Sequence, residues 1–187
     1  MLKTLLLSLS LLLAPLALAE ETHTPNPLVV IKTSEGDITL RLFADKSPIA
    51  VQNFLTYVDE DHYDGTIFHR VIPDFMIQAG LTAELARKET RDPIVNEAKK
   101  NKLHNTRGTV AMARLDAPDS ATDQFFINLR NNLSLDWTPG RAGYTVFGEV
   151  IQGMRVVDFI ATAPTGKVAG RANVPLQPIV IKEIVRQ

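Results

Sequence analysis

Alternating apolar and polar positions predict a chain built mainly from short strands. Residues 28–33 form an apolar run and residues 38–43 alternate, so the two segments are predicted to pair as a hairpin across a turn. The same pattern predicts a strand–turn–strand unit over residues 66–79. Single strands are predicted over residues 109–114, 124–128, 144–150 and 178–185.

Two helices accompany these strands. Ser47-Pro48 places a capping hydroxyl before a proline at the first helical position, and apolar residues then recur at helical spacing up to Val58. A shorter apolar stripe predicts a second helix over residues 153–161. Because the elements lack a β-α-β-α rhythm, the pattern favours a mainly β protein, a closed eight-stranded antiparallel barrel capped by two α-helices.

The first nineteen residues follow a different pattern. Lys3 is their only charge, residues 5–18 are almost wholly apolar, and residues 17–19 read Ala-Leu-Ala. This is typical of a secretory signal peptide over residues 1–19 that is cleaved after Ala19. Residues 20–27 are predicted to be a flexible lead-in, and residues 28–187 a single domain.

Composition and charge exclude several function classes. Without Lys3, 19 of the 20 basic residues remain against 21 acidic ones, and this formal charge of −2 argues against nucleic acid as a partner. The four histidines show no metal-ligand spacing, so neither a metal nor another cofactor is expected. An exported chain without cysteines fits a bacterial periplasm best, with no stable membrane association after signal cleavage.

Candidate chemistry is concentrated in the stretch FHRVIPDFMIQAG, which begins at Phe68. Alternation predicts that Phe68 and Arg70 share one face of the first strand, and that Met76 and Gln78 share one face of the second. A guanidinium, a thioether and an amide beside Phe75 make a poor metal or nucleophile site. They suit a neutral, partly apolar chain such as an extended peptide.

Two residues of these strands are predicted to face the core instead. His69 follows Phe68 and should point away from Arg70, so it is interpreted as a buried structural histidine. Phe125 should likewise be buried if its neighbour Phe126 faces the cleft. Residues 82–105 are charged and weakly periodic, and this predicted loop either shapes substrate choice or is merely solvated.

Four ordered blocks carry a resemblance to a known family. They are FHRVIPDFMIQAG at 68–80, TRGTVAMAR at 106–114, SATDQFFIN at 120–128 and YTVFGEV at 144–150. Together they resemble the signature of the cyclophilin-type peptidyl-prolyl cis-trans isomerases, over residues 29–185. With the signal peptide, the chain is most similar to the periplasmic bacterial members. The resemblance implies the same barrel with two capping helices.

The resemblance also implies residue roles. Arg70 would be the catalytic cation. Gln78 and the backbone of Arg114 would hold the peptide, and Ala113 and Gln124 would line the groove. The residues that would wall a proline pocket are Phe75, Met76, Phe126 and Leu135.

Two positions depart from the eukaryotic members of the family. Ser134 stands where many of them have a tryptophan, and Trp137, three residues on, is not taken as its substitute. Tyr144 stands where they have a pocket histidine, and it is interpreted either as a pocket wall or as a barrel-end residue. Weak cyclosporin binding is therefore expected.

The resulting functional hypothesis is a monomeric proline isomerase that acts on proline-containing peptides and on unfolded exported proteins, and so assists their folding. The first alternative is a binding module or holdase chaperone with the same groove and incidental turnover. The second is a barrel that carries a small apolar ligand, which a packed interior would exclude.

Overall fold

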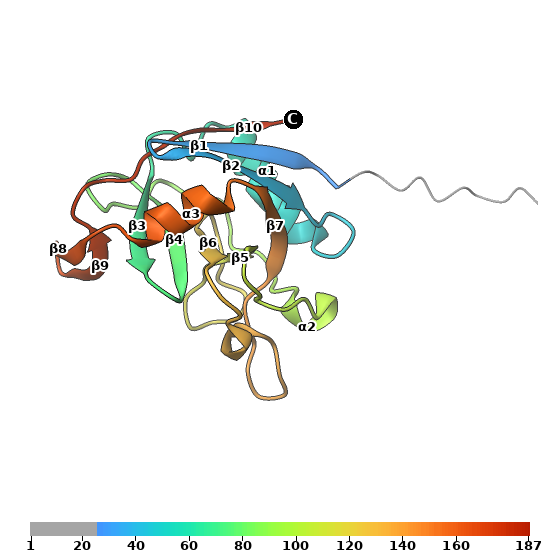
Figure 1. The fold of residues 1–187 in the computed structure, drawn as a ribbon. Helices are drawn as coiled ribbons and strands as arrows, with labels where there is room; N and C mark the ends of the chain where they lie inside the picture. Colours follow the sequence, from blue (N-terminus) through green and yellow to red (C-terminus); the bar gives the residue numbers. More distant parts are fainter. Residues whose placement is uncertain (1–25) are drawn as a thin grey trace, which may run out of the picture.

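The computed structural model describes residues 26–187 (Figure 1). The predicted signal peptide, its cleavage site and most of the predicted lead-in lie outside these residues. The last two residues of the lead-in are held against the end of β2 and the chain just after it. Asn26 Oδ1 accepts a hydrogen bond from Ala44 N at 3.1 Å, and Pro27 O accepts one from Leu42 N at 2.8 Å.

Eight antiparallel strands form one strongly curved sheet in the order β10-β1-β2-β7-β5-β6-β4-β3. The predicted strands are confirmed, with ends that shift by at most three residues. Their bounds are β1 Leu28–Thr33, β2 Gly36–Leu42, β3 Ile67–Ile72, β4 Met76–Leu81, β5 Thr109–Met112, β6 Phe125–Asn128, β7 Val146–Gln152 and β10 Ile181–Arg186.

The barrel is less completely closed than the sequence predicts. Its edge strands β3 and β10 are joined by one isolated bridge, between Ile67 and Val180, and by short backbone hydrogen bonds such as Ile181 N to Thr66 O at 2.8 Å. No continuous ladder links them in the part of the chain that the structure describes. The reason is that only residues 179–181, at the start of β10 and just before it, lie against residues 65–68, whereas the rest of β10 pairs with β1.

Both predicted helices are confirmed, as α1 (Pro48–Asp59) and α3 (Met154–Ala161). The predicted cap of α1 is wrong. Ser47 Oγ donates instead to Val146 O at 2.6 Å, and the carboxylate of Glu97 accepts hydrogen bonds from Ile49 N and Ala50 N, at 3.3 and 2.9 Å. A carboxylate from a distant segment therefore caps this helix and complements its positive end.

Residues 82–105 are more structured than a plain loop. They contain the short helix α2 (Ala98–Asn101), and Ile94 forms a bridge with Ala121. A second feature that the sequence did not indicate is the hairpin of β8 (Thr165–Val168) and β9 (Arg171–Pro175), which packs beside β3 (Figure 1). Its strands are only four and five residues long and show no alternation of buried and exposed positions, so they carry little periodic signal.

The barrel interior is filled by the protein's own side chains. Phe54 of α1 meets Phe125 edge-on at 5.4 Å between ring centroids and packs against Phe147 at 5.2 Å. The α3 residues Val157 and Ile160 belong to the same buried cluster. Because apolar side chains of the protein occupy the space, the interior does not serve as the cavity of a small-ligand carrier.

Candidate active site

A bulge in β3 sets the direction in which Arg70 points. Phe68 pairs with Ala79 and Arg70 with Gln78, so the register shifts around His69. Phe68 is fully buried in the interior, whereas Arg70 is exposed on the outer surface. The prediction that these two residues share a face is therefore wrong, because the extra residue of a bulge reverses the alternation.

The outer face of the sheet brings the predicted residues into one row. Arg70 pairs with Gln78, Gln78 with Phe126, and Phe126 with Ala111, which in turn pairs with Val146. Residues directly opposite each other on neighbouring strands share a face of the sheet. The row therefore runs from a charged end at β3 to an apolar end at β7.

Amide side chains connect the charged end of this row. Gln78 Oε1 lies 3.5 Å from Arg70 Nη1, and Gln78 Nε2 donates to Gln124 Oε1 at 3.0 Å. Gly80, at φ 117°, allows this close approach, since a Cβ there would lie 2.9 Å from Gln124 Cγ. Arg70, Gln78 and Gln124 thus form a polar rim of groups that can hydrogen-bond to a peptide.

The apolar end of the row forms a cluster separate from the interior. Met76 and Phe126 form its buried floor together with Ala111 and Val146. Seven partly buried residues pack around this floor. They are Phe43, Ile72, Phe75, Leu103, Ala113, Leu135 and Tyr144. All four residues predicted to wall a proline pocket therefore lie in one cluster.

Tyr144 belongs to this cluster rather than to a barrel end. Its ring meets Phe126 edge-on at 5.7 Å between centroids, and its N–H donates to Leu135 O at 2.9 Å. The Arg114 guanidinium lies 4.5 Å from the centroid of the Tyr144 ring, and its Nε donates to Gly143 O at 2.9 Å. The Arg114 side chain thus supports the pocket wall from behind.

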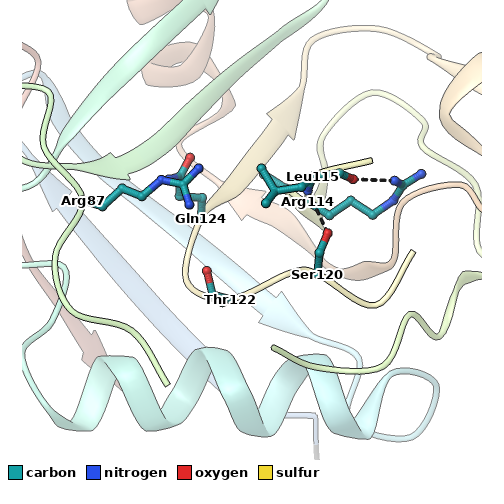
Figure 2. Close-up of a pocket in the computed structure, with 7 residues that line it drawn as sticks. Arg87, Arg114, Leu115, Ser120, Thr122 and Gln124 are labelled. Atoms are coloured by element: carbon teal, nitrogen blue, oxygen red, sulfur yellow. Dashed lines mark hydrogen bonds between the residues drawn. The ribbon is translucent and has the colours of Figure 1, made fainter. Parts of the chain in front are cut away.

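A small pocket of about 40 Å³ continues the groove past Gln124 (Figure 2). It is lined by Ala113, Arg114 and Gln124, which were predicted, and by Arg87, Leu115, Ser120 and Thr122, which were not. In Figure 2 the Arg87 guanidinium reaches toward Gln124, whereas the Arg114 side chain turns away toward the carbonyl of Leu115. Among residues 26–187, Arg87 forms no ion pair.

His69 is buried beneath the site, as predicted. Burial lowers the pKa of its imidazole to about 4, and the positive charges of Arg171 and Arg70 act in the same direction. Its Nδ1 has no hydrogen-bond partner. The ring is therefore neutral at physiological pH, and the charge beside the groove is that of Arg70.

Several residues of the site escaped the sequence analysis. Ala111 could have been found, because it lies two residues before Ala113 on the same strand face. Leu103 enters the cluster from the segment 82–105, which has no periodicity to signal it. Trp137 lies outside the cluster, with Lys99 Nζ 5.9 Å from its ring centroid, so it does not replace the missing pocket tryptophan.

Between residues 26 and 187 no group of three or more His, Cys, Asp or Glu side chains could hold a metal ion. Among the helices of the same range, none is long and apolar enough to cross a bilayer. The groove presents to a ligand the Arg70 guanidinium, the amides of Gln78 and Gln124 and an apolar pocket, and the Arg87 guanidinium lines the small pocket beyond Gln124.

Comparison with known proteins shows the family of the chain. The family described as cyclophilin type peptidyl-prolyl cis-trans isomerase/CLD matches residues 28–186. A peptidyl-prolyl cis-trans isomerase of Acinetobacter baylyi is 52% identical over 157 residues, which cover 83% of each protein. Peptidyl-prolyl cis-trans isomerase A of Dickeya dadantii is 46% identical and covers 94% of this chain and 90% of its own length.

Solved structures give the same result. A cyclophilin type peptidyl-prolyl cis-trans isomerase of Cryptosporidium parvum, crystallised in the presence of the dipeptide Ala-Pro, superposes with a TM-score of 0.69 at 28% identity. The match covers 86% of this chain and 98% of the parasite protein. The chain belongs to the cyclophilin-type peptidyl-prolyl cis-trans isomerase family, which confirms the predicted family, fold class and enzyme class.

Proposed function

We propose that the groove on the outer face of β3, β4, β6 and β5 catalyses rotation about X-Pro peptide bonds, with Arg70 as the catalytic cation. The single observation that carries this proposal is the row Arg70–Gln78–Phe126, which places a guanidinium beside an apolar pocket across three neighbouring strands. Proline-containing peptides are the substrates.

The chemistry requires no covalent bond to the enzyme. Amide resonance gives the peptide bond a rotational barrier of about 18–20 kcal/mol, and uncatalysed exchange of X-Pro bonds takes tens to hundreds of seconds. The enzyme must therefore bind the twisted state better than either planar state. In the twisted state the proline nitrogen regains its lone pair and can accept a hydrogen bond.

Each part of the groove has a role in this step. Met76, Phe126 and Leu135 hold the pyrrolidine ring, which is the fixed end of the rotating bond. Arg70 donates toward the proline nitrogen or holds the carbonyl side as it turns, and its planar, permanently charged fork suits either task. Gln78, Gln124 and the backbone of Arg114 hold the flanking peptide units.

The test is NMR exchange spectroscopy on a short Ala-Pro peptide with the protein and its Arg70→Ala variant. Loss of a preorganised donor should lower kcat/KM by about 100- to 1000-fold. Arg70→Lys should recover only part of the rate, because a lysine keeps the charge but lacks the planar fork. Arg155→Ala, an exposed arginine on α3, is the matched control and should leave the rate unchanged.

The possible outcomes separate the alternatives. If the wild type binds the peptide without accelerating exchange, the protein is a binding module or holdase and not an isomerase. Equal acceleration of exchange by the wild type and by Arg70→Ala would still show isomerase activity, but it would mean that Arg70 is not the catalytic residue.

We also propose that the protein is exported to the periplasm, where it assists the folding of secreted proteins as a monomer. The support is the sequence of residues 1–19 and the absence of cysteine. Mass spectrometry of the protein from a periplasmic fraction should give a chain that begins at Glu20. A cytoplasmic chain that retains Met1 would contradict export.

Cyclosporin is proposed to bind weakly, because Ser134 is exposed and small and Tyr144 is already packed between Phe126 and Arg114. Titration of the wild type with cyclosporin checks this expectation, and tight binding would contradict it.

A further inference from the structure

Four buried polar side chains lie behind the apolar pocket. Asn105 and Asn128 are completely buried, and Asn132 and Asp136 are 3% and 8% exposed. Buried polar groups cost free energy unless each one is hydrogen-bonded, so such a group indicates a connected network. The mechanism above uses none of these side chains.

Asn132 is the centre of this network. Its Nδ2 donates both of its hydrogens, one to Phe75 O at 2.7 Å and one to Asn128 Oδ1 at 2.8 Å. Its backbone N–H donates to Asn105 O at 2.7 Å, and its carbonyl accepts from Leu135 N at 2.8 Å. One residue therefore joins its own segment, 128–135, to the backbone at Phe75 and at Asn105. Its use in these bonds also shows that the Asn132-Leu133-Ser134 sequon is not an accessible acceptor for a glycan.

The network continues from Asn128 to a carboxylate. Asn128 Nδ2 donates to Thr109 Oγ1 at 3.0 Å and to Asn105 Oδ1 at 3.2 Å, and Asn105 Nδ2 donates to Asp136 Oδ1 at 3.0 Å. Asp136 also accepts from Asn105 N, and its other oxygen lies 2.8 Å from His104 Nδ1. Burial opposes ionisation of Asp136, but these hydrogen bonds hold its pKa below the usual value, so the network ends on an anion.

The pocket walls differ in how they are held. Met76 and Phe126 lie on β4 and β6, where the backbone ladder fixes them. Phe75 lies in the turn between β3 and β4, and Leu135 ends the 3₁₀ turn Leu133–Leu135. Neither of these two walls belongs to a strand. Asn132 bonds directly to the backbone of both, through the Phe75 carbonyl and the Leu135 N–H.

We propose that Asn132 is a positioning residue that sets the separation of the Phe75 and Leu135 walls and so determines affinity for the proline ring. This rests on the groove being the substrate site proposed above. Walls held in place before binding lose less conformational freedom when the peptide binds. Since they grip the ring in the planar and twisted states alike, their loss weakens both states equally and changes binding rather than turnover.

The test compares the wild type with Asn132→Asp, an isosteric change that removes both donated hydrogens. The peptide dissociation constant, measured by NMR titration with an Ala-Pro peptide, should rise about five- to tenfold, the equivalent of one hydrogen bond. The value of kcat at saturating peptide should stay within about twofold. NMR signals of the Phe75 ring and the Leu135 methyl groups should shift.

Thr66→Val is the matched control. Thr66 is completely buried and its Oγ1 donates to a backbone carbonyl, Tyr63 O, at 2.6 Å, but neither residue belongs to the outer cluster. This variant should lower the melting temperature and leave the dissociation constant unchanged. If Asn132→Asp does not fold, Asn132→Ser carries the test. Its hydroxyl can donate only one hydrogen, and a smaller rise in the dissociation constant is expected.

The readouts keep this proposal separate from the proposed function. Wild-type exchange reports on the isomerase, whereas the ratio of dissociation constants between variant and wild type reports on Asn132. An unchanged dissociation constant, or a fall in kcat alone, would overturn the positioning role even if the wild type is fully active.

Discussion

Phe125 and Phe126 are neighbours on β6, yet they lie on opposite faces of the sheet. Phe125 is fully buried among the aromatic rings of the barrel interior, and Phe126 lines the cluster on the outer face. On the inner face Phe125 packs against the rings of Phe54 and Tyr63, whereas the outer cluster is bordered by Arg70, Gln78 and Gln124. The difference indicates that one face holds the fold together and the other holds the substrate.

Truncating each ring is the strongest test of this division. Phe125→Ala should lower the free energy of unfolding by about 3–5 kcal/mol, because it leaves a cavity in a closed interior. Phe126→Ala should cost less, because water can enter the opened pocket, but it should weaken peptide binding. Denaturant unfolding and peptide titration measure the two effects. If both variants lose the same stability and bind the peptide equally well, the two faces do not have these different roles.

The acid sensitivity of the fold should come in part from His69, which is buried beneath Arg70. Its pKa is about 4 in the folded protein and 6.5 in the unfolded chain, so the unfolded state binds more protons between these values. Stability should therefore fall as the pH is lowered from 6.5 to 4, by roughly 2–3 kcal/mol between pH 7 and pH 4.5. Unfolding curves at several pH values check this slope.

His69→Gln provides the comparison for that slope. It removes the titrating group, so its stability should depend less on pH over the same interval. Identical slopes in the two proteins would show that His69 is not the responsible group.

Removing the cap of α1 tests whether residues 82–105 stabilise the interior face of the barrel. Glu97→Ala removes the acceptor for Ile49 N and Ala50 N and should lower the free energy of unfolding by about 1–2 kcal/mol. Glu89→Ala changes an exposed carboxylate of the same segment and should have no measurable effect. Peptide affinity should be unchanged in both. If Glu97→Ala leaves the free energy of unfolding unchanged, α1 does not depend on this contact.

The smallest expected effect concerns the pocket beyond Gln124. Because Arg87 forms no ion pair within residues 26–187, peptides with an acidic residue near the proline should be favoured over basic ones by roughly two- to fivefold in kcat/KM. Arg87→Glu should reverse this preference and leave neutral peptides unaffected. The preference should fade at high salt. A preference that survives the charge reversal would have to come from elsewhere on the outer face.

The eight strands of the barrel, the helices α1 and α3 and most of the site could be predicted from the sequence, because alternation and helical spacing are local signals. Met76, Gln78 and Phe126 needed only strand periodicity and an ordered set of motifs to be placed in one groove. The face of Phe68 was mispredicted, because a bulge depends on how β3 pairs with β4 and leaves no trace in the composition.

Contacts between segments far apart in the chain were decided only by the tertiary structure. The cap of α1 comes from Glu97 rather than from the adjacent Ser47, and the Phe75 and Leu135 walls are joined through Asn132. A buried carboxylate or amide looks like any surface residue in the sequence. Its partner is chosen by the packing of the whole barrel, since only there must every buried donor and acceptor be satisfied.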